Sequence, residues 1–172
     1  MGNTRGAVRI VVAVVGVVVV AAYAALLAVN ALVLDPLAAV PGATLPQIHE
    51  RIEAAGMSVA GDVRGVVVVA SIGVVLAIVA AVVGLAARLP ATVVVVMHLG
   101  VLAAGAPATF QSGFWLGMDV ADTFPTDGGA HTIWAGVLYL TSLAAFVAIP
   151  VVLAVTAVRT RNTQRQRQLA AG

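Results

Sequence analysis

IVVAVVGVVVVAAYAALLAVNALVL, residues 10–34, is an apolar run in which only Tyr23 and Asn30 carry polar groups. The hydrocarbon core of a membrane is about 30 Å thick, and a helix rises about 1.5 Å per residue, so about 20 apolar residues cross it. The run is therefore long enough to form a transmembrane helix.

Three further stretches meet the same criterion. They run from Val66 to Ala87, from Ala91 to Phe110 and from Thr132 to Val158. None of them alternates polar with apolar residues, as a membrane barrel strand must. Their many valines would favour strands in water, but in lipid a helix satisfies its own backbone hydrogen bonds. The sequence therefore predicts an all-α membrane protein, a bundle of four transmembrane helices.

The composition supports one membrane domain over residues 1–172. The chain is 62% hydrophobic and 9% charged, whereas soluble domains carry roughly 25% charged residues. The first apolar run is about twice the length of a signal-peptide core, so we expect it to be retained as a span.

The arginines predict the orientation, because the chain contains no lysine. With four spans, the N-terminus, the connection between the second and third spans, and the tail 159–172 share one side. That side carries seven of the nine arginines and no acid, whereas the other side carries two arginines and all seven acids. The positive-inside rule places both termini in the cytoplasm, and we expect the plasma membrane of a bacterium. The seven arginines are Arg5, Arg9, Arg88, Arg159, Arg161, Arg165 and Arg167.

The arginines of the tail are explained by this orientation across the membrane, so the basic character of the chain does not indicate nucleic-acid binding. Close to the inner leaflet they are also expected to attract anionic lipid. The lipid bilayer is thus the first predicted partner.

The first outer loop, residues 35–65, contains the pattern of a short amphipathic helix. Thr44 and Gln47 have capping-box spacing, and Gly56 provides a stop. Ile48 and Ile52 fall on one apolar face. This extracellular helix is predicted to act as a lid over the helix ends, and the alternative is a docking helix for another subunit.

The second outer loop, residues 111–131, is rich in aromatic and acidic residues. The aromatic residues, Phe110, Phe114, Trp115, Phe124 and Trp134, are placed as an interfacial belt would be. The candidate ligands of a cation are Asp119, Asp122, Asp127 and His131. Their spacing matches no dedicated metal site, so we expect solvated acids, a turn at 127–129 and no bound metal.

His98 lies in the third apolar stretch, roughly 12 Å from its cytoplasmic end. At a similar depth in the fourth stretch, Pro150 leaves the carbonyl of Phe146 without its helical donor. We predict that a neutral His98 donates to a carbonyl near this kink and so joins the two spans.

Two functional readings of His98 remain open, a haem or quinone ligand and a proton relay. A second histidine at the same depth is missing, since His49 and His131 belong to the outer side. No acid or arginine lies in the middle of any span, although a relay needs such groups.

The function expected from these features is that of an accessory or scaffold subunit, not of an enzyme, and no cofactor is predicted. The chain lacks cysteine and a nucleophile motif. Small residues recur every four positions at 73, 77 and 81, at 80 and 84, and at 100 and 104, a pattern that supports close helix packing within the chain, with other membrane subunits or in self-association.

Two alternatives remain. One is a small-molecule or lipid carrier with a cavity near His98, Asn30, Ser71 and Thr141; the other is a redox subunit that shares a cofactor through His98. The candidate interaction residues are His98, Pro150, Trp115, Asp119, Asp122, His131, Ile48 and Ile52.

Overall fold

The computed structural model describes residues 2–169, and within this range the chain is helical with no strand. Four helical rods are long and apolar enough to cross a membrane: Gly6–Ala39, Val59–Ala86, Ala91–Thr123 and Ile133–Gln164. The predicted all-α architecture with four candidate membrane spans is therefore confirmed.

The first rod consists of three helical segments in continuous succession. α1, Gly2–Val29, leads into a π-helical segment, η1, Asn30–Leu34, and then into α2, Asp35–Ala39. Pro36 explains the change of pitch, because a proline ring clashes with the carbonyl four residues earlier and cannot donate to it. The wider π turn relieves this clash, and the rod extends beyond the predicted end at Leu34.

The predicted amphipathic helix is present as α3, Leu45–Ala54, with both hydrogen bonds of the Thr44–Gln47 capping box. Gly56 ends it with a φ of +88°, which favours glycine. α4, Val59–Ala86, follows after a short connection.

The third rod is interrupted near its middle. α5, Ala91–Ala103, and α6, Gly105–Thr123, meet at Ala104. Pro107 accounts for the break, because it cannot donate to the carbonyl of Ala103, four residues earlier. A loop was expected after Phe110, but α6 continues to Thr123. No further proline interrupts the helix before Pro125. The connection to the last helix therefore covers only residues 124–132.

The last helix, α7, extends over Ile133–Leu169. Hydropathy marks the end of the apolar run at Val158, but the helix does not stop there. Arginine and glutamine are good helix formers, so the polar tail continues the same helix.

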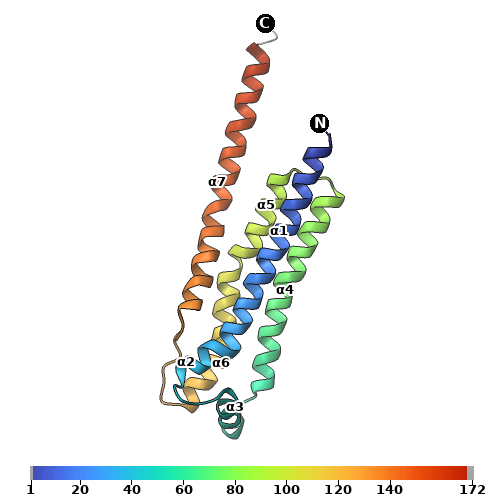
Figure 1. Ribbon diagram of the computed structural model, residues 1–172. Coiled ribbons are helices and arrows are strands. Elements are labelled where there is room, and N and C mark those ends of the chain that lie inside the picture. Colours follow the sequence, from blue (N-terminus) through green and yellow to red (C-terminus); the bar gives the residue numbers. More distant parts are fainter. Residues whose placement is uncertain (1, 170–172) are drawn as a thin grey trace.

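α1, α4 and α5 contact one another, and α7 packs mainly on α5 and α6 (Figure 1). The side of α4 that faces this core is lined with the small residues of the predicted stripe, and Cβ on Gly84 would come within 2.6 Å of Val94. The stripe at this end of α4 is thus used for packing within the chain. Its buried members are Ala77, Ala80, Ala81 and Gly84.

α1 begins and α7 ends at one end of the molecule, which we call the terminal end (Figure 1). α2, α3 and the connection 124–132 lie at the opposite end, which we call the loop end. The polar side chains that make hydrogen bonds between helices lie at the loop end and along α1.

Candidate functional site

His98 makes a local hydrogen bond instead of the predicted bond to α7. Its Nδ1 lies 2.8 Å from the carbonyl oxygen of Val94, one turn earlier in α5. Since a carbonyl only accepts, Nδ1 carries a proton, and in the neutral imidazole Nε2 is then the acceptor nitrogen. The prediction that His98 donates near Phe146 is therefore wrong, because a carbonyl within its own helix is already in reach.

The imidazole ring packs on α1. Cβ on Gly16 would lie 2.4 Å from ring atoms of His98, so only a glycine fits beneath the ring. His98 is 4% exposed, and Nε2 has no hydrogen-bond partner among the described residues. The histidine thus sits at the α1–α5 contact, whereas Pro150 lies exposed on α7.

A second polar cluster lies along α1, α6 and α7. The hydroxyl of Tyr23 lies 2.8 Å from Oγ1 of Thr109 and 3.0 Å from Oγ of Ser142. Thr109 and Ser142 are buried, so these three hydroxyls satisfy one another inside an otherwise apolar bundle. Gly105 provides the space, because Cβ there would come within 2.6 Å of the Tyr23 ring.

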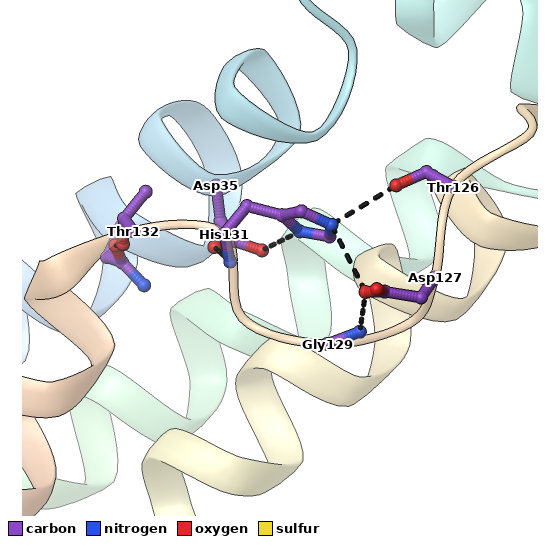
Figure 2. Close-up of polar contacts among 7 residues, drawn as sticks. Asp35, Thr126, Asp127, Gly129, His131 and Thr132 are labelled. Atoms are coloured by element: carbon purple, nitrogen blue, oxygen red, sulfur yellow. Dashed lines mark hydrogen bonds and ion pairs between the residues drawn. The ribbon is translucent and has the colours of Figure 1, made fainter.

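At the loop end, Asp35 and His131 join the first rod to the last connection (Figure 2). The backbone N–H of His131 donates to Oδ1 of Asp35 at 2.7 Å. The ring nitrogen Nδ1 lies 3.6 Å from Oδ2 of Asp35, which is an ion-pair distance but too long for a hydrogen bond. On the other side of the ring, Nε2 lies 3.1 Å from Oγ1 of Thr126 and 3.3 Å from Oδ1 of Asp127.

Two more side-chain bonds complete this junction. Oγ1 of Thr132 donates to Oδ1 of Asn30 at 2.6 Å. Oδ1 of Asp127 accepts the backbone N–H of Gly129 at 2.9 Å, which forms the predicted turn at 127–129. We call these contacts of Asn30, Asp35, Asp127 and His131 the loop-end clamp.

Among the acids proposed as cation ligands, Asp127 contacts His131, whereas Asp119 and Asp122 do not converge with this pair. Among the described residues, no three histidine, aspartate or glutamate side chains form a group able to hold a metal ion. Asp122 is exposed on α6, and Asp119 faces Asp62 of α4 instead. Two carboxyl groups thus meet where α4 and α6 reach the loop end.

Ile48 and Ile52 of α3 are fully buried, at 0% exposure, in a cluster with Val59, Leu116 and Val120. The apolar face of α3 is therefore covered by the chain itself, as the predicted lid requires. Beside this cluster, Arg51 stacks over Phe124 at 5.5 Å. Trp115 is half-buried and packs on Gly65 of α4.

A cavity of about 220 Å³ opens beside the loop-end clamp, among α1, α6 and α7. Asn30 and Asp35 reach it from the first rod, Thr109 from α6 and Tyr139 from α7. Phe110 and Phe114 also line it, with ring centroids 5.9 Å apart. We call this cavity the α1/α6/α7 pocket.

A second cavity, of about 160 Å³, lies among α1, α4, α5 and α6 and is lined almost entirely by apolar side chains. Of the four residues expected around a carrier cavity, only Asn30 lines the α1/α6/α7 pocket. His98 packs on Gly16, Ser71 is exposed, and the hydroxyl of Thr141 donates to Val137 of its own helix.

Sequence reasoning missed the roles of Asp35 and Tyr23. The sequence places Asp35 in the first outer loop, yet it lies in a continuous helical rod. It accepts a hydrogen bond from the backbone N–H of His131, which is almost a hundred positions later. A sequence signal existed, since Asp35 directly follows an apolar run and precedes a proline. Its partner, however, could only be found from the fold.

No protein-family model, curated protein or solved structure matches this chain.

Proposed function

We propose that this chain is a four-span protein of a bacterial plasma membrane and acts as an accessory or scaffold subunit of a larger membrane complex. In this proposal both termini are cytoplasmic. The support for the orientation is the arginine bias, with seven arginines assigned to the terminal side and every acid to the other. α3 and the loop-end clamp would then be extracellular.

The packing of α7 is the observation that carries the subunit role. Its buried residues form one narrow stripe, and beyond Ala145 none of its described side chains is buried. In a complex a partner helix would pack on residues 146–158, which in a chain that worked alone would face lipid. The stripe consists of Ala135, Leu138, Ser142 and Ala145.

The experiment compares two leucines of nearly equal exposure on two different helices. Leu153 on α7 is 52% exposed and Leu76 on α4 is 50% exposed. A photo-cross-linking amino acid replaces each in turn in the native membrane, and a tag on the tail isolates the products. We expect a stoichiometric membrane partner to be captured from position 153 and not from position 76.

The same purified sample separates the alternatives. A colourless protein with no partner at either position would overturn the subunit role and favour a carrier. A bound chromophore lost in His98→Ala would also overturn it, in favour of a redox subunit. Capture of a second copy alone would replace the accessory role with self-association.

A further inference from the structure

Asp35 brings a carboxylate to the α1/α6/α7 pocket. Its side chain is 14% exposed, and among the described residues its only ion-pair partner is His131. When that imidazole is neutral, the carboxylate charge is not balanced. None of the residues that line the pocket is an arginine. The pocket therefore attracts positive charge and disfavours anions.

Aromatic rings form another part of the same wall. Phe110 and Phe114 are 60% and 48% exposed, stack on each other and line the pocket together with Tyr139. The faces of such rings attract organic cations, most strongly where water is excluded. A carboxylate combined with aromatic faces is the arrangement that selects an alkylated or primary ammonium group.

The remaining wall is apolar and suits a hydrocarbon body. Leu27, Ala31 and Leu138 lie on the bundle side of the pocket. Asn30 and Thr109 supply polar groups beside them, and both side chains are 6% exposed. Small-ligand sites commonly combine a largely apolar surface with a few fixed polar groups in this way.

We propose that the α1/α6/α7 pocket binds an amphiphilic organic cation, with its ammonium group at Asp35 and its apolar body against α6 and α7. This site is independent of the subunit role proposed above. It requires only the described helices and the loop-end clamp, which holds Asp35 in place through His131.

The test uses a pair of probes of the same shape. Benzyltrimethylammonium carries the charge, and neopentylbenzene replaces its nitrogen with carbon. Binding of each to the full-length protein is measured by saturation-transfer NMR in nanodiscs made only of phosphatidylglycerol, with benzenesulfonate as the anionic comparison. The signal of protein-free nanodiscs is subtracted, because the anionic bilayer itself attracts the cation. We expect saturable binding of the cation, at least about tenfold weaker binding of the neutral probe, and none of the anion.

Two variants with matched controls place the binding in this pocket. Asp35→Asn keeps an oxygen to accept the His131 N–H but removes the charge, and Asp122→Asn makes the same change on an exposed acid. Gly113 lines the pocket and a Cβ there meets no atom within 4 Å, so Gly113→Leu adds a side chain at the pocket wall without a clash at Cβ. Gly136→Leu adds the same side chain to open space on α7, outside the pocket.

The cation should bind about tenfold more weakly to Asp35→Asn and Gly113→Leu, and unchanged to the two controls. Equal binding of charged and neutral probes, or unchanged affinity in both pocket variants, would overturn the proposal. Repeating the titration with phosphatidylethanolamine in the nanodiscs distinguishes the natural source. If phosphatidylethanolamine competes with the cationic probe, the natural ligand is a lipid headgroup. If it does not compete, the natural ligand is a free amine. Either result requires the same ammonium site.

Discussion

At the scale of single residues, His98 and Gly16 form the closest of the glycine contacts among the described residues. The ring occupies the space that a Cβ on Gly16 would need. A buried acceptor nitrogen without a partner costs about 1–3 kcal/mol, and Nε2 of His98 is such an atom among the described residues. Within the described part of the chain, His98 therefore carries an unpaired polar atom at a close contact between α1 and α5.

Gly16→Ala should lower stability by about 1–3 kcal/mol, because the added methyl group collides with a ring that is already packed. Thermal unfolding in nanodiscs measures the loss. Gly100→Ala is the control, since a Cβ there meets no atom within 4 Å. In a His98→Ala background the Gly16→Ala penalty should disappear, and a penalty that persists would show that the ring is not the cause.

At the scale of elements, α3 covers the loop end with two isoleucine side chains. Ile48→Ala should lower the free energy of unfolding by about 2–5 kcal/mol, because it leaves a cavity in a fully buried cluster. Ile133→Ala removes the same atoms from a side chain that is 78% exposed, and should change little. Hydrogen exchange of the α3 amides should rise in the first variant only. Equal exchange in both would mean that α3 is not held by this face.

The elements also show how far the sequence was informative. Length and hydropathy predicted the four spans, and the Thr44–Gln47 and Gly56 signals predicted α3, because these features depend on neighbouring residues. The π turn at Asn30, the length of α6 and the bond from His131 to Asp35 could not be predicted. They depend on how proline clashes are relieved and on which residues the fold brings together. His98 illustrates the same limit, since its position within the third span could be read from the sequence but its hydrogen-bond partner could not.

At the scale of the whole molecule, the proposed orientation can be measured directly, because the chain has no cysteine to interfere. Ala54→Cys and Gln164→Cys place single thiols at exposed positions of the two ends. A membrane-impermeant maleimide added to intact cells should label position 54 at once and position 164 only after permeabilisation. The opposite pattern would reverse the orientation and place the loop-end clamp in the cytoplasm.

The length of α7 has a mechanical consequence at the other end. Its 37 residues extend for about 55 Å, of which a membrane core accounts for only about 30 Å. The remainder continues past the end of α1 as a single uninterrupted rod (Figure 1). A fluorophore attached at an exposed position of this segment would therefore stand at a distance from the bundle set by the rise of the helix.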